Sequence, residues 1–146
     1  MRKNIDMKNK LLLFALLSII AWSCSKDQRV VKDLEGDWII SSLTTNGTPE
    51  PASEYAGIVY NFTNCKVKKG DCDGSVTIPD STKGTVKQTF TYGISEKGKK
   101  ITINLSVLTL TQTIVGDIQE HSDTKFVYSY TESGGTDKIV ETLSRK

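Results

Sequence analysis

Three cysteines have the most distinctive chemistry in this 146-residue chain. Cys65 and Cys72 lie seven positions apart, whereas Cys24 stands alone near the amino terminus. A thiol pair at this spacing could form a disulfide that closes a short loop, remain as two free thiols, or bind a metal ion. The metal alternative lacks a second matching pair, and the one histidine, His121, is remote in sequence. We favour the disulfide, which implies an oxidising compartment.

The other reactive side chains match no complete catalytic or metal-binding motif. Residues 120–123, Glu-His-Ser-Asp, are adjacent in sequence, whereas a catalytic triad is built from groups that converge in space. Residues 71–74, Asp-Cys-Asp-Gly, match the start of an EF-hand calcium loop but not its terminal glutamate. We interpret both segments as solvated turns and expect no enzyme activity, metal ion or cofactor.

The first 23 residues have the composition of a secretory signal peptide. Four basic residues precede an apolar run over residues 11–20, and the small residues Ala21 and Ser23 follow it. The run has about half of the ~20 residues that a membrane-spanning helix needs, so we expect this segment to be removed.

Net charge excludes one class of partner. The chain has 19 basic and 17 acidic residues, of which four and one lie in the signal segment, so the mature chain is nearly neutral. It therefore lacks the dense basic face of a nucleic-acid-binding protein.

The end of the signal segment, Ala21-Trp22-Ser23-Cys24, resembles the lipobox of bacterial lipoproteins, although Trp22 is bulkier than usual. The resemblance implies that Cys24 becomes the first mature residue and carries a diacylglycerol and acyl chains such as palmitate, which anchor the protein to the membrane. The alternative is an ordinary secretory signal with an incidental cysteine. We expect residues 24–33 to form the lipidated amino terminus and a polar tether.

Residues 25–28, Ser-Lys-Asp-Gln, are similar to the acidic export signal of surface lipoproteins in Bacteroidota, with one acid where two or more are common. The expected location is thus the outer membrane, on either its periplasmic face or the cell surface. The alternative for this segment is an ordinary tether.

Apolar and polar residues alternate along most of the remaining chain, as in Ile101-Thr102-Ile103-Asn104-Leu105. Such alternation predicts half-buried antiparallel strands, and Gly-containing turns separate them. Residues 50–55 could form a short helical turn, and Gly116 could mark a β-bulge. We expect one all-β domain over residues 34–146, an up-and-down β-barrel or alternatively a β-sandwich. The eight predicted strands span 36–43, 57–64, 74–79, 85–94, 99–106, 107–118, 124–132 and 138–145.

The start of this domain, Gly36-Asp37-Trp38, resembles the Gly-x-Trp opening of lipocalins, and the whole resembles lipocalin-like lipoproteins of Bacteroidota. The resemblance implies that Gly36 allows a tight entry into the first strand and that Trp38 plugs one barrel end. The Thr-Asp-Tyr-like motif and the helix after the barrel that typical lipocalins have are not found. Retinoid or pheromone binding is therefore not carried over.

Two functional classes remain open. The leading hypothesis is a barrel that binds a small apolar or amphipathic ligand; the alternative is a barrel with a solid core whose loops bind an unidentified protein or glycan. In the first case the cavity would be lined by inward-facing aromatic residues: Tyr60, Phe62, Phe90, Tyr92, Phe126, Tyr128 and Tyr130.

If the barrel is closed, its first and last strands in the sequence must be neighbours. The first and last strands should pair antiparallel, which brings Arg145 to the level of Trp38. In lipocalins an arginine often covers this tryptophan, so we expect a stacked pair. The alternative is that Arg145 is frayed into solvent.

Overall fold

The computed structural model describes residues 25–107 and 110–146; the signal segment and Cys24 lie outside the described residues. Within them one helix precedes the strands, and two short 3₁₀ turns, η1 and η2, flank β3. The elements in chain order are α2 (Lys26–Leu34), β1 (Gly36–Thr45), β2 (Thr48–Pro49), η1 (Ala52–Glu54), β3 (Val59–Phe62), η2 (Val67–Lys69), β4 (Cys72–Asp80), β5 (Gly84–Ser95), β6 (Lys100–Val107), β7 (Leu110–His121), β8 (Lys125–Thr131) and β9 (Lys138–Arg145).

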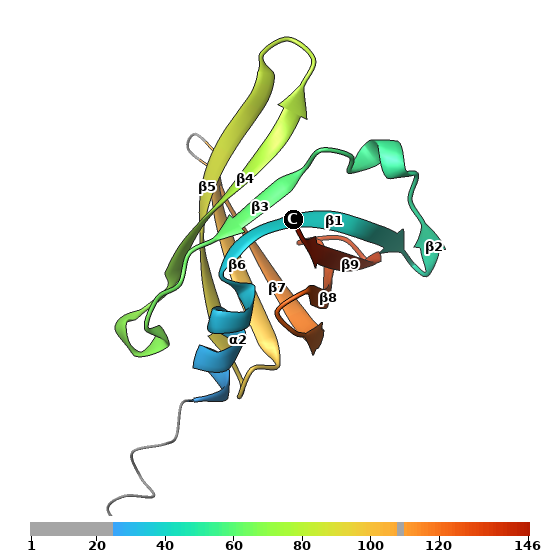
Figure 1. The fold of residues 1–146 in the computed structure, drawn as a ribbon. Helices are drawn as coiled ribbons and strands as arrows, with labels where there is room; N and C mark the ends of the chain where they lie inside the picture. The colour runs from blue at the N-terminus through green and yellow to red at the C-terminus, as the bar shows by residue number, and fades with distance from the viewer. Residues whose placement is uncertain (1–24, 108–109) are drawn as a thin grey trace, which may run out of the picture.

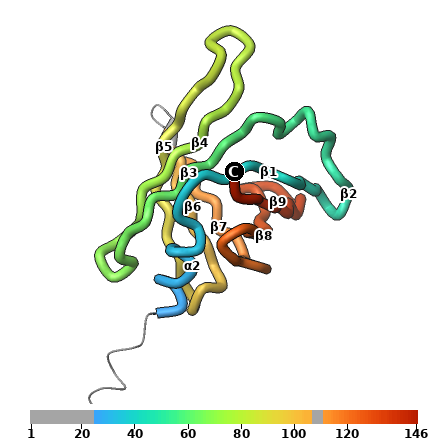
Figure 2. The backbone as a smooth tube through the Cα atoms, viewed as in Figure 1, coloured from blue at the N-terminus to red at the C-terminus, as the bar shows by residue number. Residues whose placement is uncertain are grey.

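The strands form one closed, antiparallel, up-and-down barrel (Figures 1 and 2). The sheet runs from β1 to β3 and on in sequence order to β9, which pairs back with β1 over Trp38–Thr45. The two-residue strand β2 adds only to the far end of β1. The prediction of an eight-stranded lipocalin-like barrel is confirmed, and the β-sandwich alternative is wrong because the hydrogen-bonded sheet is continuous.

The predicted strands all correspond to observed strands, but the strand expected over 107–118 runs from Leu110 to His121, and Val107 ends β6. Gly116 is not a bulge, because it stays in regular register with Ile101 on β6 and Tyr130 on β8. The irregularity of β7 lies between Ile118 and Glu120. A Cβ at Gly116 would lie 2.9 Å from Cδ2 of Tyr128, so glycine is required there for close packing of the ring.

Residues 26–33, expected to belong to a polar tether, form helix α2 together with Leu34. Ser25 caps its first turn by accepting a hydrogen bond from the Gln28 amide, 3.2 Å. Val30, Val31 and Leu34 have helical spacing and are fully buried against the end of the barrel. In isolation nine residues are too few for a stable helix in water, so packing stabilises α2. No helix in the described part of the chain is long and apolar enough to cross a bilayer.

Three polar side chains attach α2 to three different loops of the barrel. Gln28 donates to the Cys65 carbonyl, 2.7 Å, and accepts from the Val67 amide, 3.1 Å. Asp27 accepts from the Gly98 amide, 2.6 Å, and Asp33 lies 2.9 Å from Nδ1 of His121. We call this covered end the α2 end and the other the open end; in Figure 1 α2 lies at the lower end of the barrel and the β4–β5 hairpin extends away from it.

Candidate ligand-binding interior

The register places all seven predicted aromatic residues on the inner face of the barrel. Directly opposed residues in antiparallel strands share a face, so the buried Trp38 assigns Tyr60 to the interior, and Phe126 and Tyr130 oppose the inner-face residues Leu143 and Ile139. Five of the seven are nearly inaccessible to solvent: Phe62, Phe90, Tyr92, Phe126 and Tyr128. Tyr60 and Tyr130 are only half-buried.

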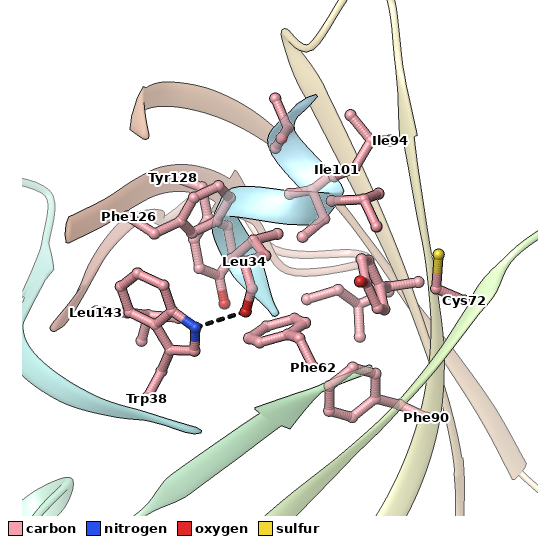
Figure 3. Close-up of a cluster of buried hydrophobic side chains, with 14 of the residues drawn as sticks. Leu34, Trp38, Phe62, Cys72, Phe90, Ile94, Ile101, Phe126, Tyr128 and Leu143 are labelled. Carbon is pink, nitrogen blue, oxygen red and sulfur yellow. Dashed lines mark hydrogen bonds between the residues drawn. The ribbon is translucent and has the colours of Figure 1, made fainter. Parts of the chain in front are cut away.

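The α2 end of the interior is filled by side chains. Trp38, Phe62, Phe126, Leu143 and Leu34 gather there (Figure 3), and all are at most 1% exposed. The indole Nε1 of Trp38 donates to the carbonyl of Leu34, 2.6 Å, which joins the barrel floor to the end of α2 (Figure 3). Trp38 thus occupies the plugging position that the lipocalin resemblance implies.

Arg145 closes this floor from the last strand. The register pairs Arg145 with Trp38, and its Cζ lies 4.4 Å from the centroid of the indole ring, as predicted. Gly36 has φ +116°, and a Cβ there would lie 2.6 Å from Nη1 of Arg145. Glycine is therefore needed for both the backbone conformation and the passage of the guanidinium.

Phe90 and Tyr92 belong to the packed core. Both rings meet Phe62 edge to face, with centroids 5.5 and 5.1 Å away. The Tyr92 hydroxyl donates to the carbonyl of Thr63, 2.8 Å, in the connection that follows β3. These two side chains, expected to line a cavity, therefore stabilise the filled half.

Burial decreases from the α2 end toward the open end on several strands at once. On β8 the order is Phe126, 0% exposed, Tyr128, 2%, and then the half-buried Tyr130. On β3 the order is Phe62, 1% exposed, and then the half-buried Tyr60. Half-buried apolar side chains that pack onto the core continue this inner face toward the open end: Ile58, Tyr60, Ile78, Leu105, Ile114 and Tyr130. A small molecule entering there would meet an apolar surface with phenolic hydroxyls.

Glu141 is the functional candidate that our sequence analysis missed. It lies on β9 opposite both Leu43 and Tyr128, and it is 2% exposed. Its Oε2 accepts a hydrogen bond from the Tyr128 hydroxyl, 2.6 Å, whereas its Oε1 has no hydrogen-bond partner. The signal was present in the sequence: Ile139, Glu141 and Leu143 alternate, which puts the glutamate on the inner face.

The electrostatics of this group follow from burial. Burial raises the pKa of Glu141 above its ordinary value, and the Tyr128 hydrogen bond and the neighbouring Tyr60 hydroxyl oppose the shift. Burial, and then the neighbouring charge of Glu141, hold the pKa values of Tyr60 and Tyr128 well above that of free tyrosine. The pKa of Tyr130 is raised by the same causes. These four residues, the Glu141 cluster, place one carboxyl group among three protonated phenols.

The α2 end has two surface pockets outside the barrel. One, of about 730 Å³, is lined by Ser25, Gln28 and residues 64–69; the other, of about 700 Å³, is lined by residues of α2 and of the 97–99 and 121–123 turns. Beside the first, the predicted disulfide joins Cys65 and Cys72, with Cα atoms 5.4 Å apart. Where the chain is described, no group of three His, Cys, Asp or Glu side chains is arranged to hold a metal ion.

His121 is not the free turn residue that its sequence suggests, since it pairs with Asp33 on α2. Ser122 bonds within its own turn, to Lys125 and Thr124. The Glu-His-Ser-Asp segment therefore serves to attach α2 to the β7–β8 turn.

Comparisons with known proteins support the fold. No family model and no curated protein matches the chain. A redesigned β-barrel is similar with a TM-score of 0.56 and 18% identity, over 81% of this chain and 96% of that one. A lipocalin-like protein from Bacteroides uniformis is similar with a TM-score of 0.53 and 18% identity, over 78% and 99%. At this identity the likeness establishes the lipocalin-like fold alone.

Proposed function

We propose that this protein is a membrane-anchored, lipocalin-like lipoprotein that binds a small apolar or amphipathic ligand through the open end of its barrel. The observation that carries the proposal is the gradient of burial along the inner face. The α2 half is filled by Trp38 and its neighbours, while inward-facing apolar side chains in the other half keep accessible surface. Accessible, mostly apolar side chains with a few polar groups among them are typical of small-molecule sites.

The position of the amino terminus supports the anchored arrangement. Ser25, which directly follows Cys24 in sequence, caps α2 at the closed end of the barrel. Acyl chains on Cys24 would therefore hold the α2 end near the membrane and leave the opposite end free to receive a ligand. Two or more acyl chains are enough for stable anchoring.

Native mass spectrometry of the full chain, extracted from its host, tests the ligand proposal. We expect a retained small molecule that is released on unfolding. Ile114 faces the interior and Val115, 52% exposed, faces solvent on the same strand. Ile114→Trp should reduce retention of the small molecule, because the larger side chain fills the interior near the open end. The matched control Val115→Trp should leave retention unchanged.

Either of two results would overturn ligand binding in the barrel: a chain that carries no ligand and takes up none from host lipid extracts, or equal retention by both tryptophan variants. The interaction-module alternative would then gain support. Its structural basis is the β4–β5 hairpin, which extends away from the barrel and ends in the exposed turn at residues 81–83 (Figure 1).

A further inference from the structure

Glu141 has a buried carboxyl oxygen without a hydrogen-bond partner, which packing of the core does not require. Buried carboxyl groups in proteins normally have hydrogen-bond partners for both oxygens, because a desolvated oxygen without one is unfavourable. Here Tyr128 satisfies Oε2, and Oε1 has no partner. Glu141 also forms no ion pair with any basic side chain of the described residues. An inward-pointing methyl or amide group would fill this position at lower cost.

The unpartnered oxygen lies where the filled half of the barrel begins. Along β9, counted from the open end, Ile139 is half-buried, Glu141 is 2% exposed and Leu143 is 0% exposed. The neighbouring strand β8 repeats this order with Tyr130, Tyr128 and Phe126. A molecule that enters at the open end and passes Tyr130 would therefore reach the carboxyl group of Glu141 as the first fully buried polar group.

We propose that the barrel binds a small amphipathic organic cation, whose protonated amine donates a hydrogen bond to Oε1 of Glu141 while its apolar part packs on the open half. This rests on the proposed function and names the ligand class. The Glu141 cluster supplies one carboxyl acceptor and three tyrosine side chains. Phenol rings favour cations over their faces, and a charge-assisted hydrogen bond is stronger than a neutral one.

The same chemistry disfavours the other amphipathic ligands. A carboxylate ligand would bring a negative charge to a buried carboxyl group, and it has no proton to donate to Oε1. An alcohol can donate one hydrogen bond but brings no positive charge to the carboxyl group. The order of binding affinities for an amine, an alcohol and an acid that share the same alkyl group is therefore the signature of the site.

Isothermal titration of octylamine, 1-octanol and octanoate measures this ranking. The full chain is held in lipid nanodiscs, and empty nanodiscs give the blank. We expect octylamine to bind about tenfold or more tightly than octanol, a difference of ~1.4 kcal/mol, and octanoate to bind most weakly. Glu141→Gln should reduce octylamine to the affinity of octanol without changing the latter. The control Glu132→Gln removes an exposed carboxylate just after β8 and should preserve the preference.

A second readout does not depend on the variant folding. In native chain labelled with ¹³C at the glutamate carboxyl carbons, octylamine should shift one buried carboxyl resonance further than octanol does. Octanol binding without an octylamine preference, or a preference that survives in Glu141→Gln, overturns the cation proposal alone. Failure of both octylamine and octanol to bind overturns the proposed function with it.

Discussion

The side chain of Arg145 contacts three separate parts of the chain at the α2 end. Its nitrogens donate to the carbonyls of Asp33, 2.8 Å, and Asp123, 2.8 Å, and to that of Glu35, while its guanidinium lies over the Trp38 ring. Two of these carbonyls belong to the end of α2, where a positive charge is favourable. A single cation thus connects the last strand, the helix and the barrel floor.

Replacement of Trp38 should destabilise the fold more than any exposed substitution. We expect Trp38→Ala to lower the free energy of unfolding by ~3–5 kcal/mol, as loss of a large buried aromatic does. Trp38→Phe should cost less but still leave the Leu34 carbonyl without its donor. The control is Ile39→Ala, since Ile39 is 38% exposed on the outer face. Urea unfolding measures each; a midpoint unchanged in Trp38→Ala would mean that Trp38 is not core.

Glu141 should make stability depend on pH with a known sign. Its pKa is raised in the folded chain, so the folded state keeps the proton more readily than the unfolded state. Its contribution to stability is complete below the ordinary pKa of 4.5 and is lost as pH rises through the folded-state pKa. The three phenols around it titrate only at higher pH, because their pKa values are raised.

Glu141→Gln removes this titration. We expect the variant to gain stability relative to the native chain as pH rises from 4 to 8, by about 1.4 kcal/mol for each unit by which the pKa is raised. Urea unfolding at several pH values measures the difference. A constant difference across the range would show that Glu141 titrates normally in the folded state.

At the scale of elements, the attachment of α2 to the barrel depends on the side chain of Gln28 as well as on the apolar face of the helix. Gln28→Ala removes two hydrogen bonds to the loop that follows β3, and we expect a loss of ~1–3 kcal/mol in unfolding free energy. Lys32→Ala changes an exposed position of the same helix and is the control. Hydrogen exchange reports the site directly: the Val67 amide should lose protection only in Gln28→Ala. Equal protection in both variants would contradict the proposed attachment.

The disulfide constrains the same loop from its other side. It closes a ring between residues seven positions apart, so chain entropy gives ~2–3 kcal/mol of stabilisation. We expect replacement of both Cys65 and Cys72 by Ala to lower the unfolding free energy by about this amount. Non-reducing peptide mapping should recover the two cysteines linked. Two alkylatable thiols in the native protein would count against the bond.

At the scale of the whole molecule, α2 covers one end of the barrel, and among the described residues no α-helix lies at the other end. The described part of the chain begins at the covered end, where Ser25 caps α2. Lipidation at Cys24 would hold the α2 end at the membrane. The open end, where we propose that the ligand enters, would then face away from the membrane.

Cys24→Ser tests the anchor. We expect this variant to accumulate unprocessed or to leave the membrane fraction, because the thiol that receives the diacylglycerol is absent. Membrane fractionation and intact-mass measurement of the mature chain give the result, and Ser25→Ala is a matched neighbouring control. An unchanged distribution with no acyl mass on native Cys24 would contradict lipidation.

The sequence alone determined the strands and the face that each side chain occupies. Both depend on the two-residue period of a strand, a local property that neighbours such as Ile101, Ile103 and Leu105 express directly. The pairing of Trp38 with Arg145 followed from closure, because the ends of an up-and-down barrel must meet. The Cys65–Cys72 bond followed from a short spacing.

Tertiary structure alone decided that residues 26–34 form a helix and that the carboxyl group of Glu141 is desolvated. Helix α2 is held by contacts such as Gln28 to Cys65 and Asp33 to His121, which join residues 37 and 88 positions apart. Alternation puts Glu141 on the inner face, but its desolvation depends on the Tyr128 ring across the strand pair and on how deeply the barrel is filled. Burial of a charge and packing of a short helix are properties of the closed barrel, so no local pattern could reveal them.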